Sequence, residues 1–350
     1  MSVSVIIPCL NEAGSIELCI NNIRKAFAHE ANLEILVADN NSSDGSPEIA
    51  IKSGARVVIE TKRGYGAAIM RGLREATGDY LVVGDADNTY DFNDGAKLVE
   101  ELKKGADFAI GNRLKLADPG SMPPLHRYVG TPVLTSILNK IFGTKVHDIN
   151  CGLRAIRRSK LPELHLRSSG MEFASEMVIH ASKARLRFAE LDIRYYKRHA
   201  GQAKLRTFRD GWRHLRFILY CAPFMVYFVP ALLGVIATAW LMMSPRLGVQ
   251  VAGILVGLSA FQIFTFGLIA KSILWVSDAF IVDKEFGALM SRFKLEHGLM
   301  VSFAMILGGV ILVMPFDISS LIRSAFLLTI GVQLFFSSFI ISTILSRRSS

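Results

Sequence analysis

Four long stretches in the C-terminal half of the chain contain no aspartate, glutamate, lysine or arginine. They cover residues 217–243, 247–270, 298–316 and 324–345. A helix needs about 20 apolar residues to cross roughly 30 Å of hydrocarbon, and each stretch has about that length. The alternative is the buried helical core of a soluble protein, which so many uncharged runs in close succession disfavour. We therefore expect an α-helical transmembrane domain of about four spans over residues 217–346.

The first 200 residues differ in composition, because charged residues and glycines alternate there with short apolar runs. That length is enough to bury a complete hydrophobic core. The N-terminus has no basic n-region and only a short apolar run, which predicts a buried strand and not a signal peptide. We expect a globular domain over residues 1–203, then a juxtamembrane amphipathic helix over residues 204–216.

The formal net charge of +10 is concentrated beside the first apolar stretch, where residues 197–216 include seven lysines and arginines and one aspartate. This placement favours anionic lipid or phosphate as a partner and not nucleic acid, with a solvated helix face as the alternative. Basic residues also mark the loop 271–297 and the C-terminal tail. The positive-inside rule therefore predicts a multi-pass membrane protein whose globular domain and C-terminus are cytosolic. If the source is prokaryotic, the membrane would be the inner or plasma membrane.

Small residues in the spans suit close helix contact. Gly253 and Gly257 are separated by one helical turn. Contacts of this kind form either between copies of the chain, giving a homo-oligomer, or within one monomer.

Strand and helix signals alternate through the first 83 residues. Strands are expected at residues 3–7, 34–38, 55–59 and 80–83, with helices at 15–30, 47–53 and 65–76. The alternation predicts βαβ units and a largely parallel, doubly wound α/β sheet of Rossmann-like type. In such sheets ligands bind outside the carboxyl ends of the strands.

Polar residues follow three of these strands: Pro8, Asn11 and Glu12, then Asp39, then Asp85 and Asp87. Alternate residues at a strand end direct two carboxylates towards a hard cation and a ribose. Mg²⁺ or Mn²⁺ is commonly shared between such carboxylates and substrate phosphates. An isolated Asp-x-Asp more often indicates a solvated turn, but the buried strand before it and the two neighbouring loops favour a nucleotide site.

A dehydrogenase is disfavoured because the first strand lacks the G-x-G-x-x-G turn that lets a backbone approach pyrophosphate. Gly64 and Gly66 match only part of this glycine pattern. They open a helix after Lys62, where they either contact phosphate through backbone N–H groups or form a tight turn.

The segments PCLNE, ADNNSSDG, KRGYGAA, GDADNTYDF, GNR and GMEFASE together resemble the family 2 glycosyltransferases of GT-A fold. The resemblance runs through residues 3–216 and is nearest to the branch of dolichol-phosphate mannose synthases and polyprenyl-phosphate glycosyltransferases. It implies an inverting transfer of a hexose from UDP-glucose or GDP-mannose to undecaprenyl or dolichyl phosphate, with Mg²⁺ or Mn²⁺.

The resemblance also implies residue roles. The nucleotide-sugar site would comprise Pro8, Asn11, Glu12, Asp39, Lys62, Gly64, Asp85 and Arg113, with the metal held by Asp85 and Asp87. The sequence departs from the commoner pattern at Asn40, where a second aspartate is frequent, and at Thr89-Tyr90, where Gln-His is frequent.

Further charged residues are candidates for catalysis and acceptor binding. Asp87 with its metal and Arg113 or Arg127 would neutralise the leaving diphosphate. Glu172 and Glu176 share a helix face, and Glu176 acts either as a base for a hydroxyl acceptor or as a structural carboxylate. The acceptor phosphate would be bound by Arg127, Arg198, Lys204 and Arg206. Asp148 and Arg154 are expected to pair with each other.

Three other functions compete with this interpretation. A processive or other membrane glycosyltransferase with a saccharide acceptor would resemble its family in a Q-x-x-R-W segment, and Gln202 is not followed by one. A non-catalytic lipid-phosphate-binding membrane protein would not need both Asp85 and Asp87. A transporter would carry ionisable pairs in its spans, which these lack.

Overall fold

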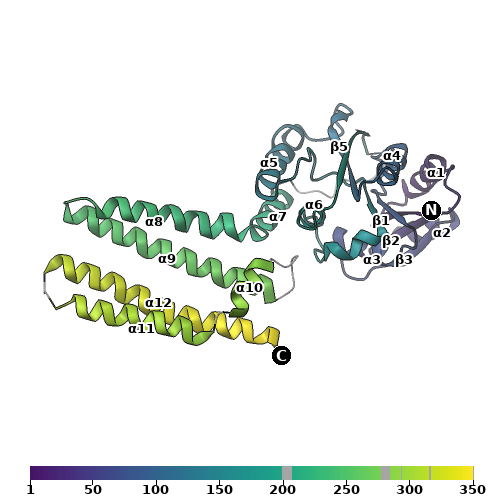
Figure 1. The fold of residues 1–350 in the computed structure, drawn as a ribbon. Helices are drawn as coiled ribbons and strands as arrows, with labels where there is room; N and C mark the ends of the chain where they lie inside the picture. The colour runs from purple at the N-terminus through teal and green to yellow at the C-terminus, as the bar shows by residue number, and fades with distance from the viewer. Residues whose placement is uncertain (199–206, 277–283, 293, 315–316, 350) are drawn as a thin grey trace. The chain divides into compact units, whose positions relative to one another are not determined.

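The computed structural model describes residues 1–198, 207–276, 284–292, 294–314 and 317–349. The chain divides into two compact units, Met1–Ile218 and Leu219–Ser350. The first unit is an α/β sheet structure and the second consists of helices (Figure 1).

A seven-stranded sheet forms the centre of the first unit, in the order β3-β2-β1-β4-β6-β5-β7. Its strands are β1 (Val3–Cys9), β2 (Leu33–Asp39), β3 (Arg56–Ile59), β4 (Tyr80–Val83), β5 (Phe108–Ala117), β6 (Arg154–Arg157) and β7 (Phe188–Tyr195). Strands β1 to β4 pair in parallel, as does β7 with β5, whereas β6 runs antiparallel to both β4 and β5. The expected α/β class is confirmed, with the correction that the sheet is mixed.

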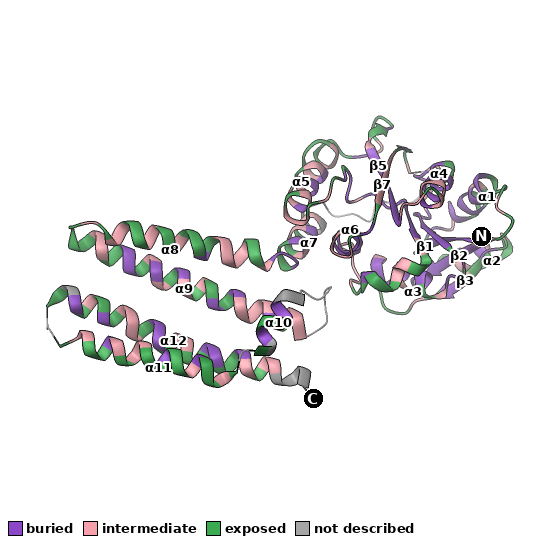
Figure 2. Cartoon of the chain, viewed as in Figure 1, coloured by how far each residue is buried: buried purple, intermediate pink, exposed green. Residues whose placement is uncertain are grey.

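The helices of the first unit carry buried as well as exposed residues (Figure 2). They are α1 (Ile16–Ala26), α2 (Ser46–Lys52), α3 (Tyr65–Glu75), α4 (Phe92–Lys103), α5 (Thr131–Phe142), α6 (Phe173–Lys183) and α7 (Thr207–Tyr220). In α1 the buried residues Ile16, Cys19, Ile20 and Ile23 recur at helical spacing, which places them on one face. The core therefore lies between these faces and strands whose side chains are almost entirely buried, such as those of β4.

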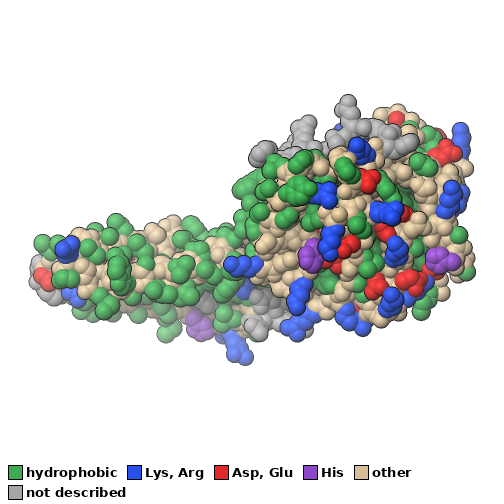
Figure 3. Space-filling model, turned by 90° about the horizontal axis from the view of Figure 1, so that it is seen from above, with side chains coloured by type: hydrophobic (Ala, Val, Ile, Leu, Met, Phe, Trp, Pro, Cys, Tyr) green, Lys and Arg blue, Asp and Glu red, His purple; other side chains and the backbone are tan. Residues whose placement is uncertain are grey.

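The second unit contains the helices that are long and apolar enough to cross a membrane. Within the described residues these segments are Phe224–Met242, Leu247–Val276, Leu295–Leu312 and Ser320–Leu345. They belong to α8 (Val229–Met242) with the π-helical turn Phe224–Phe228 before it, α9 (Leu247–Val276), α11 (Leu295–Leu312) and α12 (Ile318–Ser349). On the face drawn in Figure 3 their surface is largely hydrophobic, whereas charged side chains gather on the globular unit.

The helix ends differ from the uncharged stretches of the sequence, most clearly at α7 and α9. Helix α7 continues to Tyr220, so the first apolar helix begins only after Pro223. Helix α9 continues past Lys271 to Val276, and the Lys271 ammonium lies 4.5 Å from the ring centroid of Phe286 on α10 (Lys284–Arg292). A cation over an aromatic face is attracted by the ring quadrupole, which helps to accommodate the charge at this helix.

The two glycines of α9 make their close contacts within the chain. A Cβ atom at Gly253 would lie 3.0 Å from the Cβ atom of Leu241, and one at Gly257 would lie 3.0 Å from the side chain of Thr238. Both neighbours are on α8. Packing within one monomer therefore accounts for these small residues, and a homo-oligomer is not needed to explain them.

Arg154 anchors the antiparallel strand of the first unit, which gives a test of the fold. Its side chain is buried, and its guanidinium donates 2.6 Å hydrogen bonds to the carbonyls of Ile149, Cys151 and Ala174. We predict that Arg154→Met lowers the free energy of unfolding by at least about 3 kcal/mol, because each unsatisfied buried acceptor costs about 1–3 kcal/mol. Thermal unfolding of the full chain in detergent, followed with a thiol-reactive dye that reports exposure of the buried cysteines, measures this.

The matched control is Arg158→Met, which removes one exposed 2.8 Å hydrogen bond to Thr77 O. We expect a change within about 0.5 kcal/mol, as is usual for surface substitutions. Equal melting temperatures for the two variants would contradict the anchoring role of Arg154.

Candidate functional site

Carboxylates from three strand ends gather at one edge of the sheet. Glu12 follows β1, Asp39 ends β2, and Asp87 lies in the loop after β4. Because these strands are parallel neighbours in the order β2-β1-β4, their carboxyl ends meet. Arg198, which follows β7, joins two of the carboxylates: its guanidinium contacts Glu12 and lies 3.4 Å from Asp87 Oδ2.

The loops after β1 and β2 are fastened to each other. Asn11, at φ 52°, receives a hydrogen bond from the backbone N–H of Ser43 and donates its own N–H to Ser42 Oγ. The Glu12 N–H donates 2.8 Å to Ser46 Oγ. Asp39 accepts hydrogen bonds from both the N–H and the hydroxyl of Ser42. The backbone of the acidic edge is therefore held by protein contacts.

Asp85 is the carboxylate whose protonation the site alters most clearly. Burial raises the pKa of Asp85 to about 6, and the neighbouring charge of Asp87 acts in the same direction. The hydroxyl of Tyr65 donates 2.8 Å to Asp85 Oδ1 and opposes the rise. Two carboxylates that repel each other in a partly buried place favour a cation between or beside them.

The oxygen donors fit a divalent ion such as Mg²⁺ or Mn²⁺. Asp87 Oδ1 accepts hydrogen bonds from the N–H and hydroxyl of Thr89, at 3.2 and 2.7 Å, which fixes the carboxylate. The other oxygen, Oδ2, faces the Arg198 guanidinium, so the position beside it already holds positive charge. Hard cations bind such carboxylate oxygens and share them with phosphates.

Asn40 fastens the segment before α3 to this edge. Its amide donates to the carbonyls of Glu60 at 2.8 Å and Lys62 at 2.9 Å, and its Oδ1 accepts the Gly64 N–H at 2.7 Å. An aspartate could not donate the first two bonds. The departure from the commoner family pattern at Asn40 therefore has a structural reason.

The glycine turn before α3 serves close packing. Gly64 has φ 141°, and a Cβ atom there would lie 2.1 Å from Ser169 O. The Gly64 N–H is donated to Asn40, and the Ala67 N–H is donated to Ser169 O. Of the two alternatives for this segment, the contacts favour a tight turn, with the Lys62 side chain exposed beside it.

Arg113 is already paired. It forms two hydrogen bonds with Asp148, of 2.6 and 2.9 Å, and lies 5.2 Å from the Tyr195 ring centroid. The expected pair of Asp148 with Arg154 is wrong, since Arg154 instead binds the carbonyls of Ile149 and Cys151 and, on α6, that of Ala174. The sequence suggested only the nearby Arg154 as a partner, because the approach of Arg113 on β5 to Asp148 is a contact between segments 35 residues apart.

Two of the residues proposed for catalysis bind backbone groups. Arg127 donates to the carbonyls of Leu114 and Ala117 at 2.9 to 3.2 Å. Glu176 is buried, and it accepts the N–H groups of Arg167 and Ser168 at 3.0 and 2.9 Å. Both side chains thus hold loops. Lys204 and Arg206 lie outside the described residues.

The site contains residues that the sequence did not single out. A Cβ atom at Gly152 would lie 2.8 Å from Asp85 Oδ2, 3.0 Å from the Tyr90 hydroxyl and 3.2 Å from the Tyr65 hydroxyl. Tyr90 also accepts the Gly152 N–H at 2.7 Å. The KRGYGAA and GDADNTYDF segments supplied Tyr65 and Tyr90, whereas Gly152 was not singled out because its contacts depend on long-range packing. Pro8 was expected to follow the first strand, but it lies on β1, which continues to Cys9.

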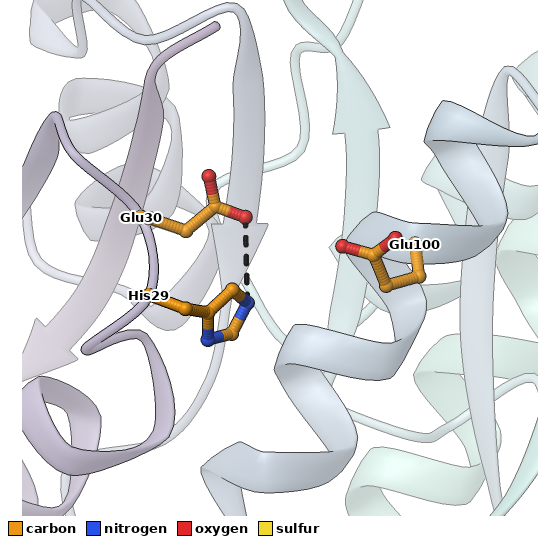
Figure 4. A group of neighbouring side chains, drawn as sticks. All are labelled: His29, Glu30 and Glu100. Atoms are coloured by element: carbon orange, nitrogen blue, oxygen red, sulfur yellow. Dashed lines mark ion pairs between the residues drawn. The ribbon is translucent and has the colours of Figure 1, made fainter.

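A second acidic cluster lies apart from this edge, at the ends of α1 and α4 (Figure 4). It contains His29, Glu30 and Glu100. The Lys103 ammonium donates to Glu30 at 2.6 Å and to Glu100 at 2.9 Å. The lysine therefore supplies the positive charge that a metal would bring, and the cluster is a surface ion-pair network.

Comparison with known proteins relates this site to a family. The model of the family described as "Glycosyl transferase family 2" matches residues 4–164. The chain is 35% identical over 371 residues to the low-salt glycan biosynthesis hexosyltransferase Agl6 of Haloferax volcanii, covering 98% of this chain and 89% of that protein. It is 30% identical to a dolichol-phosphate mannosyltransferase of Pyrococcus furiosus, covering 61% and 63% of the two chains.

Among solved structures, glucosyl-3-phosphoglycerate synthase from Mycobacterium tuberculosis, in complex with Mn²⁺, UDP and glucosyl-3-phosphoglycerate, matches with a TM-score of 0.52 at 24% identity. The match covers 63% of this chain and 80% of that one. This likeness confirms the expected fold class of the first unit.

Asn40 provides the test of the site's architecture. We predict that Asn40→Asp lowers the affinity for UDP or GDP in the presence of Mn²⁺ by about tenfold. The new carboxylate would face the two carbonyls that the amide binds, and the 60–64 segment would be released. Leaving such a buried group unsatisfied costs about 1–3 kcal/mol. Asn41→Asp adds the same charge one residue away and removes a single exposed 3.2 Å bond to Thr61 O, so its affinity should stay within about twofold. Isothermal titration measures both, and equal losses would contradict the role of Asn40.

Proposed function

This chain belongs to glycosyl transferase family 2 and is a glycosyltransferase of GT-A fold, and from that premise we propose that it transfers a hexose from a nucleotide diphosphate sugar to a polyprenyl phosphate. UDP-glucose and GDP-mannose are the donors that the sequence resemblance favours. The acceptor would be undecaprenyl or dolichyl phosphate. The observation that carries the proposal is the acidic edge of the first unit, in a chain that continues into four apolar helices.

The donor half of the proposal rests on the acidic edge. Asp39 lies at the end of β2, where it would meet the base, and Asp85 and Asp87 follow β4, where ribose and diphosphate would lie. A bound Mg²⁺ or Mn²⁺, held by Asp87 with Asp85 beside it, would neutralise charge that develops on the leaving diphosphate. Tyr65 and Thr89 keep the two carboxylates oriented for this task.

The acceptor half rests on three observations. The chain resembles a protein named dolichol-phosphate mannosyltransferase. Its second unit has helices long and apolar enough to cross a membrane, which is where a lipid phosphate would be met. The Glu176 carboxylate, the candidate base for a hydroxyl acceptor, is occupied by two backbone N–H groups. A phosphate monoester is already anionic at neutral pH and needs no such base.

In the proposed reaction an acceptor phosphate oxygen attacks the anomeric carbon of the sugar. The bond from that carbon to the diphosphate oxygen breaks, and its electron pair leaves with the nucleoside diphosphate. Attack from the face opposite the leaving group inverts the anomeric configuration. The chain's own task is to hold both substrates in line and to stabilise the negative charge, which is usually the largest electrostatic contribution to such catalysis.

Basic residues would bind the acceptor phosphate. Arg198 already lies at the acidic edge, and the sequence places Lys204 and Arg206 shortly after it. Arg127 would contribute by fixing the 114–117 segment through its two carbonyl contacts. We also propose that the site faces the cytosol, on the basis of the positive-inside rule. A lipid phosphate at headgroup level is accessible from that side.

The proposal predicts transfer of radiolabel from UDP-glucose or GDP-mannose to undecaprenyl or dolichyl phosphate by the purified full chain with Mn²⁺. Asp87→Asn should reduce the rate at least 100-fold, because the loss of a group that stabilises developing charge costs about 2.7–4 kcal/mol. Asp118→Asn, which neutralises an exposed carboxylate, is the matched control and should retain the wild-type rate.

Labelled lipid recovered by thin-layer chromatography measures the rate. If none of the donors labels lipid while a saccharide acceptor is labelled, the polyprenyl phosphate assignment is refuted.

A further inference from the structure

Arg198 differs from Arg113 and Arg154 in the partners that it binds. Arg113 and Arg154 are buried, and they bind Asp148 and backbone carbonyls, which are structural partners. The Arg198 guanidinium instead contacts Glu12 and Asp87, which are carboxylates of the proposed donor site. About a fifth of its side chain is exposed.

The backbone before Arg198 is fixed to the loop that carries Asp87. Tyr196 N–H donates 2.8 Å to Thr89 O, and Tyr195 forms a bridge with Tyr90, with the two rings 5.2 Å apart. Thr89 in turn binds Asp87 Oδ1 and leaves Oδ2 on the side of Arg198. The contact of Arg198 with Asp87 is therefore set by the chain's own pairing.

We propose that Arg198 is a positioning residue that acts as a tethered counter-cation, competing with the divalent metal for Glu12 and Asp87 until donor and metal arrive together. The inference rests on the proposed function, because it requires Asp87 to be a metal ligand. It goes beyond that function by assigning Arg198 a position in the donor-free enzyme.

The physical basis is charge compensation. Asp85, Asp87 and Glu12 repel one another at an edge that water only partly screens, and the guanidinium relieves this repulsion in the absence of metal. A divalent ion at Asp87 Oδ2 cannot share that position with a guanidinium 3.4 Å away, because two cations would then repel. Metal binding must displace Arg198.

Displacement of Arg198 by the metal would make its guanidinium available to bind phosphate. A released guanidinium at this edge presents paired N–H donors that match phosphate oxygens. The donor diphosphate brings the negative charge that offsets both cations. Arg198 would then turn from the carboxylates to phosphate only in the loaded site, so that the metal alone binds weakly and the metal with nucleotide binds well.

The test is Mn²⁺ affinity of the full chain in detergent without nucleotide, measured from the electron paramagnetic resonance signal of free Mn²⁺. Arg198→Gln should tighten Mn²⁺ binding by about five- to tenfold, although it slows lipid labelling. Lys197→Gln removes the same charge from the neighbouring exposed side chain and should leave the Mn²⁺ affinity within about twofold. Unchanged or weaker Mn²⁺ binding by Arg198→Gln would overturn the proposal.

A second pair of variants separates this inference from the function on which it rests. Asp87→Asn should abolish Mn²⁺ binding with either Arg198 or Gln at position 198. If Asp87→Asn leaves Mn²⁺ binding intact, the metal site itself is misassigned. If Asp87→Asn abolishes binding but Arg198→Gln does not tighten it, the metal site stands and the competition is refuted.

Discussion

Repulsion among carboxylates at one end of the sheet is the constraint on which the rest of the first unit depends. Parallel pairing of β2, β1 and β4 forces the residues that follow these strands together. Burial and the charge of Asp87 together raise the pKa of Asp85 to about 6, which shows that negative charge there is costly. Positive charge must therefore be supplied, by Arg198 within the chain or by a metal ion with its nucleotide. A site with this need is suited to stabilising a diphosphate that leaves with added negative charge.

The residues around the acidic edge are held in place by hydrogen bonds and ion pairs. Arg113 is held by Asp148 and Arg154 by three carbonyls, and from these fixed positions both positive charges lower the pKa of Asp85. Asn40 and Thr89 fix the loops with neutral hydrogen bonds that add no further negative charge. Preorganisation of this kind spares the enzyme from rearranging its dipoles during the reaction.

The first four strands, and the polar residues after β1, β2 and β4, could be predicted from the sequence, because these three strands are short, mostly buried apolar runs followed by polar loops. The antiparallel β6 could not, since Arg154 begins it with a charge whose partners are backbone carbonyls. The true partners of Asp148 and the turn role of Gly64 depend on contacts between distant segments. The absence of charge also misplaces the end of α9, because Lys271 lies within the helix, beside the ring of Phe286.

The central claim is that the acidic edge binds a nucleoside diphosphate together with a divalent ion. An electron cryo-microscopy structure of the full chain in lipid nanodiscs, with Mn²⁺ and UDP or GDP, tests it most directly. The account predicts nucleotide density against Asp39 and Asp85, an ion at Asp87, and the Arg198 guanidinium withdrawn from Asp87. Nucleotide bound elsewhere, or bound at this edge with Arg198 still on Asp87 and no ion, would contradict it.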